Sequence, residues 1–454
     1  MRPRLDAIRE CLEGVIPGTM ATASPDGTPN VSYLSQVQFV DSDHVALSYQ
    51  FFNKTRHNLM ANPHALLIVT SPLSMAQYRL SLEYLRTETA GPLFESMKAK
   101  LAGIASHTGM SGVFRLLGSD VFRVNSIEQV PGETLPAAPP QRNLLAALRA
   151  TSSRLSACAD LDRLLAETLA CLEQQFGIQY TMVLMFDESS SRLYTVASRG
   201  YQSSGVGSEI ALGDGVIGVA ARERTPIRIG HMNSEYSYSR AIRESTASSE
   251  FADALESEIP LPGLCQPRSQ LAIPITTGER LHGVLYVESE QDLRFSYDDE
   301  DALASVAGHL GTAIQLLQGA SENVEEILGA TRAPVPRRGP APAAAPLLIR
   351  HFRENDSIFL GDDYLIKGVA GSIFWTLLKD YSDKQRTEFT NRELRLDGRI
   401  RLPDVSDNLE ARLILLSRRL EERDGPIRIG KTGRGRFRLS VDCPIRLAEE
   451  QERA

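Results

Sequence analysis

The sequence predicts a multidomain α+β protein, because the chain is long, carries two proline-rich breaks and changes its pattern across them. At 454 residues it is too long for one hydrophobic core, so about three domains are expected. Residues 131–140 hold four prolines and residues 333–346 hold five, which is typical of spacers between domains. The expected parts are a strand-rich domain over 1–130, an α+β domain over 143–330, a Pro/Ala linker over 331–346 and a helix-and-hairpin domain over 347–446.

The net charge of −8 is unevenly distributed. Residues 347–446 contain 20 Lys and Arg against 16 Asp and Glu, which leaves the other 354 residues with a charge of −12. An acidic body with a mildly basic end suits a protein whose last domain touches nucleic acid.

Composition favours a cytoplasmic protein without a membrane span. The chain has no run of about eighteen apolar residues, and its first residues, Met-Arg-Pro-Arg-Leu-Asp, lack the apolar core of a secretion signal. Five cysteines are scattered without a CxxC pair, which fits a reducing compartment and argues against a structural zinc site.

Short strands with turn signals fill the first domain. Asp26-Gly27 is a tight-turn signal between two such strands. Many antiparallel strands with two helices are typical of a small barrel. The expected strands are 19–23, 30–34, 37–40, 44–50, 65–70, 78–89 and 120–127, and the expected helices are 54–61 and 93–105.

A strand end meets a helix start at Lys54, Thr55 and Arg56, with Asn58 close behind. Free N–H groups and the positive dipole end at a helix N-terminus can hold a phosphate. The stretch 47–63 resembles that of the pyridoxamine-phosphate-oxidase-like, FMN-binding split barrels, in which this turn grips the flavin phosphate at a dimer interface. The resemblance implies a split β-barrel, FMN or a related flavin at Lys54, Thr55, Arg56 and Asn58, and a homodimer.

The strand 33–38, Tyr-Leu-Ser-Gln-Val-Gln, departs from that family, whose oxidases place arginine and lysine against the flavin there. An alternative is therefore a barrel kept for folding or dimerisation without a cofactor. Turnover as an FMN-dependent oxidoreductase is a further alternative.

The second domain mixes helices with antiparallel strands, a pattern that predicts an α+β domain. A terminal helix starts at Ser296, where Asp299 is placed for a capping box, and runs to about residue 328. The other expected helices are 144–157, 161–176 and 218–224, and the expected strands are 181–186, 193–198, 209–212, 227–230, 271–276 and 281–288, with a polar insertion at 233–268.

Several short motifs of this domain resemble those of GAF sensor domains. They include Leu212-Gly-Asp-Gly-Val-Ile-Gly, Ser269-Gln-Leu-Ala-Ile-Pro-Ile and Gly283-Val-Leu-Tyr-Val-Glu-Ser. The resemblance implies a small-molecule pocket, for which His231, Tyr236, Tyr238 and Cys265 are the candidate lining residues. A GAF domain that only dimerises, without a ligand, is the alternative.

The third domain ends in an apolar helix, 406–422, and a basic two-stranded ribbon, 427–439. Leucines at 409, 413, 416 and 420 form one stripe of the helix. At 3.6 residues per turn, Asn408, Arg412 and Arg419 lie within about 40° of one another on a flank of that stripe. Thr390 with Glu393 predicts a capping box for the preceding helix.

These elements resemble the winged-helix domains at the C-termini of response-regulator-type transcription factors. The resemblance implies groove contacts by Asn408, Arg412 and Arg419, and wing contacts by Lys431, Arg434 and Arg436. Four carboxylates on or beside the helix, Asp407, Glu410, Glu421 and Glu422, would repel phosphates. A winged helix used for protein contacts is therefore the alternative.

Together the domains predict a cytoplasmic one-component sensor and transcriptional regulator. A small molecule, redox state or flavin would act on the first two domains, the helix 297–328 would transmit the change, and a homodimer would bind double-stranded DNA. The sequence shows no Ser/His/Asp arrangement, metal-spaced cluster or Walker-type loop, so an enzyme is not expected. The alternatives are a flavin-dependent oxidoreductase regulated by its GAF domain and a protein-binding signalling scaffold.

Overall fold

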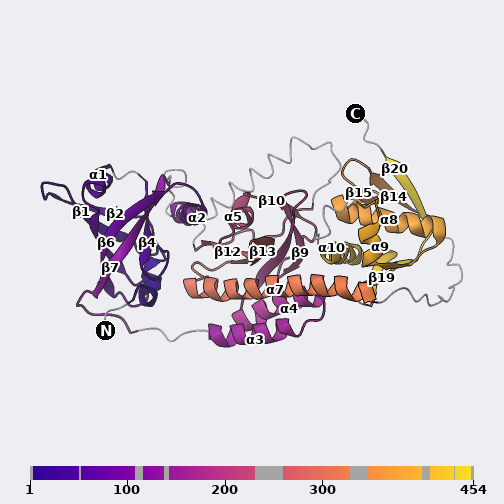
Figure 1. Ribbon diagram of the computed structural model, residues 1–454, viewed down its shortest axis with the longest axis horizontal. Helices are drawn as coiled ribbons and strands as arrows, with labels where there is room; N and C mark the ends of the chain where they lie inside the picture. Colours follow the sequence, from indigo (N-terminus) through magenta and orange to yellow (C-terminus); the bar gives the residue numbers. More distant parts are fainter. Residues whose placement is uncertain are drawn as a thin grey trace.

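The computed structural model describes residues 4–50, 53–107, 116–136, 143–230, 259–327, 346–400, 409–433 and 435–450. The chain is a multidomain α+β protein with curled sheets. Figure 1 shows three units in a row along the longest axis of the molecule. We call them the barrel unit (within 4–136), the central unit (within 143–327) and the C-terminal unit (within 346–450).

One seven-stranded antiparallel sheet forms the barrel unit, in the order β2-β1-β5-β6-β7-β4-β3. Its core contains Leu67, Leu80 and Phe122, because alternate strand residues face inward. All the expected strands and both helices are present, and a 3-10 helix, η1, precedes them unpredicted. The bounds are η1 (Leu5–Leu12), β1 (Gly18–Ala23), β2 (Pro29–Leu34), β3 (Val37–Phe39), β4 (His44–Tyr49), α1 (Asn53–Ala61), β5 (His64–Thr70), β6 (Gln77–Glu88), α2 (Pro92–His107) and β7 (Gly118–Gln129).

The central unit is a six-stranded antiparallel sheet in the order β10-β9-β8-β13-β12-β11. Helices α3, α4 and α7 pack on one face and α5 packs on the other (Figure 1). The expected elements are present, including the bonds between Ser296 and Asp299 at the start of α7. The bounds are α3 (Leu144–Ser156), α4 (Leu161–Phe176), β8 (Tyr180–Asp187), β9 (Arg192–Arg199), β10 (Glu209–Ala211), α5 (Gly215–Glu223), β11 (Ile227–Ile229), β12 (Ser269–Thr277), β13 (Arg280–Ser289) and α7 (Tyr297–Ile327).

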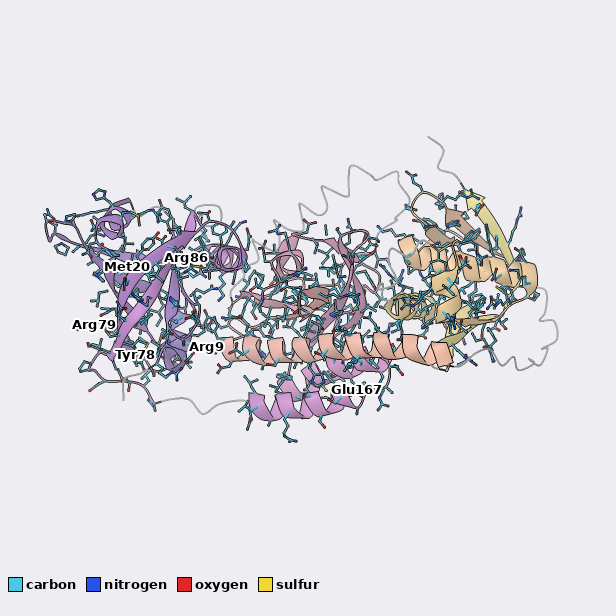
Figure 2. All side chains as sticks on the ribbon, in the orientation of Figure 1. Arg9, Met20, Tyr78, Arg79, Arg86 and Glu167 are labelled. Atoms are coloured by element: carbon cyan, nitrogen blue, oxygen red, sulfur yellow. The ribbon has the colours of Figure 1, made fainter. Side chains whose placement is uncertain are left out.

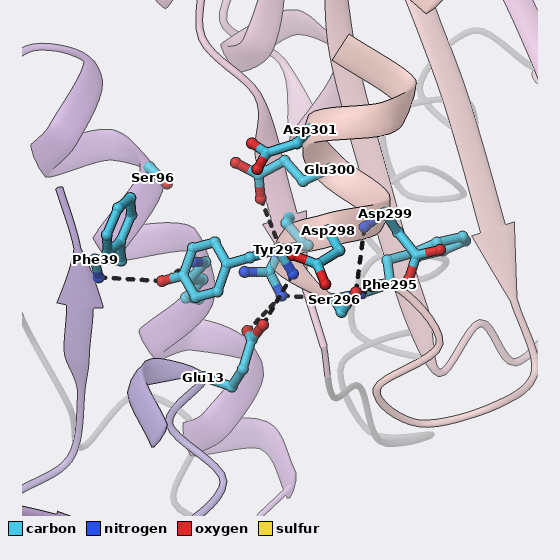
Figure 3. Close-up of polar contacts among 12 residues, drawn as sticks. Glu13, Phe39, Ser96, Phe295, Ser296, Tyr297, Asp298, Asp299, Glu300 and Asp301 are labelled. Atoms are coloured by element: carbon cyan, nitrogen blue, oxygen red, sulfur yellow. Dashed lines mark hydrogen bonds and ion pairs between the residues drawn. The ribbon is translucent and has the colours of Figure 1, made fainter. Parts of the chain in front are cut away.

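Tyr297 lies where the barrel and central units meet (Figure 3). Its hydroxyl accepts a bond from the backbone N–H of Phe39 at 3.2 Å, and its own backbone N–H donates to Glu13 at 3.0 Å. The guanidinium of Arg228 pairs with Glu13 at 2.5 Å and with Glu300 at 2.6 Å, and lies 4.3 Å from the centre of the Tyr297 ring. Because the Arg228 side chain is 2% exposed, this junction is a buried ion-pair network.

Two further cations surround the same ring. Arg9 lies beside the start of α7 (Figure 2), pairs with Asp301 at 2.6 Å and has its guanidinium 4.9 Å from the centre of the Tyr297 ring. Lys100 donates to the Tyr297 hydroxyl at 3.3 Å. Burial, and then the charge of Arg228, lower the pKa of Lys100 to about 8.

The described residues of the C-terminal unit form two small sheets and three helices. The sheets have the orders β16-β15-β14-β20 and β17-β19-β18. The capping box of Thr390 and Glu393 is confirmed, whereas β14, β17 and the terminal strand β20, which pairs in parallel with β14, were not predicted. The bounds are β14 (Leu347–Phe352), β15 (Ser357–Leu360), β16 (Asp363–Ile366), α8 (Gly368–Lys384), β17 (Glu388–Thr390), α9 (Asn391–Leu396), α10 (Leu409–Glu422), β18 (Ile427–Gly433), β19 (Arg436–Val441) and β20 (Ile445–Glu450).

One continuous apolar core extends through the central and C-terminal units. Helix α10 contacts α8 and β18 of its own unit and α4 and β9 of the central unit. The predicted leucine stripe of α10 is buried. None of the helices in the described ranges combines the length and apolar composition that crossing a bilayer requires.

Candidate functional site

A buried carboxylate is the centre of a polar site in the central unit. Glu288, on β13, is 2% exposed. Its Oε1 accepts a bond from the backbone N–H of Leu264 at 2.8 Å, and its Oε2 accepts bonds from the Tyr286 hydroxyl at 3.0 Å and from Gln270 Nε2 at 3.4 Å. We call Glu288, Gln270, Tyr286, Tyr201 and the backbone of Leu264 the Glu288 site.

Strand register brings these side chains together. Gln270 of β12 lies opposite Glu288 of β13, and Tyr180 of β8 lies opposite Glu288 on its other side. Since side chains alternate between the two faces of a sheet, Tyr286 shares the face of Glu288. Ile217 and Ala220 of α5 pack on the apolar side chains that complete this face of the sheet, namely Met182, Leu184, Ile227, Ala272 and Val284.

Burial governs the electrostatics of the Glu288 site. It raises the pKa of Glu288 above its ordinary value, and burial with the nearby Glu288 charge raises the pKa of Tyr201. Within the described part of the chain, Gln270 Oε1 is buried without a hydrogen-bond donor. The acceptors of the site, the Glu288 carboxylate and Gln270 Oε1, would bind a cation or an N–H-bearing group.

The sequence placed the ligand pocket elsewhere. His231, Tyr236 and Tyr238 lie outside the described residues. Cys265 is exposed among the residues that the structure describes. The signal that could have found Glu288 is a polar residue at an inward position of an otherwise apolar strand.

The four predicted flavin-phosphate residues have different surroundings. Lys54 is exposed at the start of α1. Thr55 and Asn58 are turned inward, where Thr55 Oγ1 accepts a bond from Asn30 at 2.9 Å and Asn58 Nδ2 donates to Thr22 at 3.1 Å. Their polar groups are therefore used in holding α1 on the sheet.

Arg56 is half-buried between an aromatic ring and a carboxylate. Its guanidinium lies 4.3 Å from the centre of the Tyr49 ring and pairs with Asp120 at 2.9 Å. Burial outweighs this pairing and raises the pKa of Asp120. The adjoining cavity of about 10 Å³ has room for about one water and is too small for a flavin.

Helix α10 borders the core of its own unit, the central unit and a groove. At about 100° per residue, the leucine stripe faces the core of its own unit, whereas Arg412 and Arg418 lie about 120° apart on either side of Leu415. Both arginines bond to the central unit. The face with Glu410 and Glu421 borders a groove of about 350 Å³ beside the β18–β19 hairpin. Both signs of charge line this groove, because Arg418 of α10 and the hairpin residues Lys431 and Arg436 also border it.

The predicted groove-facing arginines of α10 do not face solvent. Arg412 pairs with Asp187 of the central unit at 2.8 Å, with the two side chains 7% and 11% exposed. Arg419 donates to the backbone carbonyl of Leu365 at 3.1 Å and pairs with Glu422, so it is bound within its own unit. In this structure neither side chain faces a groove, because the flank of the leucine stripe is packed against the central unit at Arg412 and within the C-terminal unit at Arg419.

The hairpin residues are more accessible. Arg436 is exposed, and Lys431 has a 45% exposed side chain that pairs with Glu410 at 3.2 Å and with Asp160 of the central unit at 3.6 Å. The other two predicted DNA contacts, Asn408 and Arg434, lie outside the described residues.

Family comparison identifies two of the three units. Residues 160–314 match the GAF domain family, and residues 5–116 match the pyridoxamine 5'-phosphate oxidase family. The chain contains a GAF domain and an oxidase-type split barrel. The GAF match lies in the central unit and the oxidase match in the barrel unit, and no curated protein matches the chain.

Solved structures resemble single parts of the chain. An FMN-binding protein of Syntrophomonas wolfei subsp. wolfei is 19% identical, with a TM-score of 0.24, over 28% of this chain and 86% of its own. The GAF domain of an Acinetobacter phosphoenolpyruvate-protein phosphotransferase is 19% identical, with a TM-score of 0.30, over 38% and 94%. Free methionine-R-sulfoxide reductase of Neisseria meningitidis is 22% identical, with a TM-score of 0.30, over 39% and 91%.

Proposed function

We propose that this chain is a ligand-controlled regulator, in which the GAF domain binds a small molecule at the Glu288 site and the C-terminal unit acts on double-stranded DNA. The buried acceptor set of Glu288 and Gln270 carries the sensing half of the proposal. A carboxylate so far removed from water favours a partner that brings a positive charge or N–H donors. The apolar residues of the same face favour a hydrocarbon part, so the effector is an amphipathic amine or a similar cation.

Two probes of equal chain length test the sensing half. We expect n-hexylammonium to raise the melting temperature of the full-length protein and n-hexanol to leave it unchanged, because a ligand that binds only the folded state stabilises it. Glu288→Gln should abolish the response, whereas Glu290→Gln, at an exposed position two residues away, should retain it. Equal responses to both probes, or an undiminished response in Glu288→Gln, would overturn the assignment.

The barrel unit adds a second input. Its match to the pyridoxamine 5'-phosphate oxidase family supports a flavin as its cofactor. Lys54 and Arg56 fit the flavin phosphate, since one is an exposed ammonium and the other a half-buried guanidinium at the start of the same helix. A bound flavin would supply redox chemistry, which makes the redox state of the cell a candidate signal.

The C-terminal unit supports the DNA half of the proposal through its element order and its cations. Three helices lead into the β18–β19 hairpin, the order of a winged helix. Lys431 and Arg436 on that hairpin are accessible to a phosphate backbone. A homodimer would present two such units to a duplex.

A further inference from the structure

We infer that the GAF domain holds the basic face of α10 in a covered state, and that DNA binding requires this contact to open. The inference rests on the DNA output proposed above. In the covered state Arg412 and Arg418 are bound to GAF residues, and the face of α10 beside the open groove carries Arg418 together with Glu410 and Glu421. The two carboxylates would repel phosphates and Arg418 is engaged by the GAF domain, so the groove-side face does not replace the covered one.

The covering contact is dense and is built from acceptors of the GAF domain. The guanidinium of Arg412 pairs with Asp187 at 2.8 Å and lies 4.2 Å from the centre of the Tyr194 ring. Arg418 donates to the backbone carbonyl of Val196 at 2.6 Å and to Asp162 at 2.7 Å. We call these contacts the α10 interface.

Asp187 is held in place for this role. Its carboxylate also accepts bonds from the Ser189 backbone N–H at 3.1 Å and from the hydroxyls of Ser189 and Ser190 at 2.7 and 2.8 Å. Burial opposes its ionisation, but the charge of Arg412 and these bonds keep the pKa of Asp187 below its ordinary value. It therefore faces Arg412 as an anion at neutral pH.

Carboxylates of the GAF domain occupy positions that DNA phosphates would otherwise take. Lys431, a predicted wing contact, pairs with Asp160 at 3.6 Å, and Lys367 pairs with Glu209 at 3.5 Å. Four cations of the C-terminal unit are thus paired with one acidic GAF surface. Because DNA and the GAF domain would use the same cations, their binding to the C-terminal unit is competitive.

Part of the boundary between the two units is already open. A cleft of about 660 Å³ lies between the GAF loop 202–205, the β15–β16 turn and the end of α10. The same loop connects the two sites, because Tyr201 lies beside Glu288 and Ser204 donates to Glu422 at the end of α10. Effector binding and opening therefore share one structural element.

The test changes only the GAF side, so that the DNA-binding chemistry is untouched. Full-length Asp162→Asn/Asp187→Asn removes both charges of the α10 interface while an amide oxygen remains to accept the Ser189 bonds. Glu173→Gln on α4 is the matched control, because its carboxylate pairs with Arg199 at 2.5 Å on an exposed surface away from α10. Hydrogen exchange of 409–422 reports opening, and fluorescence anisotropy with random-sequence duplex DNA reports binding.

We expect the double variant to exchange α10 amides faster and to bind DNA more tightly by roughly 5- to 150-fold, the usual range of coupling between two sites. Lys431→Ala/Arg436→Ala added to it should reduce that binding and its salt dependence. The control should behave as wild type.

Other outcomes separate the two proposals. Unchanged α10 exchange in the double variant, or measurable DNA binding of equal affinity in the variant and the wild type, overturns the covered state. Faster α10 exchange without any DNA binding supports the covered state but overturns the DNA output, and points to a protein partner. If the double variant misfolds by circular dichroism, Asp162→Asn/Ser204→Ala gives the same test with the Asp187 turn intact.

Discussion

At the residue scale, the main feature is a carboxylate without a cation. Glu288 is satisfied by three donors, yet burial favours its neutral form. A bound cation would reverse that preference, so effector binding would release a proton whenever Glu288 is protonated beforehand. Affinity for an amine should then rise with pH across the raised pKa of Glu288.

Replacement of Glu288 by Gln should separate stability from sensing. A raised folded pKa means that the stabilising contribution is complete below the unfolded value, about 4.5, and is lost as the pH rises through the folded value. We therefore expect Glu288→Gln, compared with wild type, to gain melting temperature as the pH rises above about 4.5, while its response to n-hexylammonium disappears. Parallel pH profiles of the two proteins would contradict the raised pKa.

At the element scale, the terminal strand β20 stabilises the C-terminal unit. Glu449 on this strand accepts bonds from Arg353 at 2.6 Å, Lys379 at 2.9 Å and the indole N–H of Trp375 at 3.1 Å. The bond from Lys379, then that from Arg353, lower the pKa of Glu449 to about 2. The parallel pairing of β20 with β14 thus joins the last strand of the unit to its first.

Glu449→Gln should destabilise the C-terminal unit, because it removes the charge that holds β20. The loss of charge-assisted bonds predicts a fall of about 1–3 kcal/mol in the free energy of unfolding at neutral pH. Because the folded pKa is lowered, the stabilisation is present above the unfolded value of about 4.5 and vanishes as the pH falls through about 2. The fluorescence of Trp375, the chain's single tryptophan, measures the transition, and Glu450→Gln, on the other face of the strand, is the control.

The elements differ in how far the sequence could predict them. The turn signal at Asp26-Gly27, the capping box at Thr390 and the leucine stripe of α10 were read correctly, because each is a local rule. Strand β20 was missed because its partner lies about a hundred residues away in the chain. Helical periodicity placed Arg412 on a flank of the leucine stripe. The residue that covers this flank, Asp187, belongs to a different domain, so local spacing could not predict the contact.

The candidate site shows the same limit. Gln270 and Glu288 stood inside motifs that indicated a GAF domain, yet only the register of β12 against β13 pairs them. The candidate pocket residues were chosen by chemical type alone, and none of them belongs to the Glu288 site. The structure places one of them, Cys265, on the surface. Register is a long-range property, so composition and spacing could not supply it.

At the scale of the whole molecule, the barrel is joined to the GAF domain by a buried network around Arg228. Two carboxylates and one aromatic ring depend on this guanidinium. Removing one member of a buried ion pair leaves the others without compensation, which is more damaging than losing an exposed pair.

Arg228→Met should therefore destabilise the junction by about 3–5 kcal/mol. The exposed Arg224→Met, whose partner Glu279 is fully exposed, should change stability by less than about 1 kcal/mol. Denaturant unfolding measures both variants, and hydrogen exchange of η1 shows whether the barrel has detached. Equal effects of the two variants would refute a buried network at this junction.

The length of α7 gives the junction mechanical leverage. Its 31 residues start at Tyr297, which is hydrogen-bonded to the barrel, and extend along the GAF core toward the C-terminal unit (Figure 1). At 1.5 Å per residue the helix is about 46 Å long, so a tilt of only about 5° at Tyr297 would carry its far end through about 4 Å. A rearrangement of the side chains around Tyr297 could thus displace the far end of α7, next to the C-terminal unit, by roughly the length of a side chain.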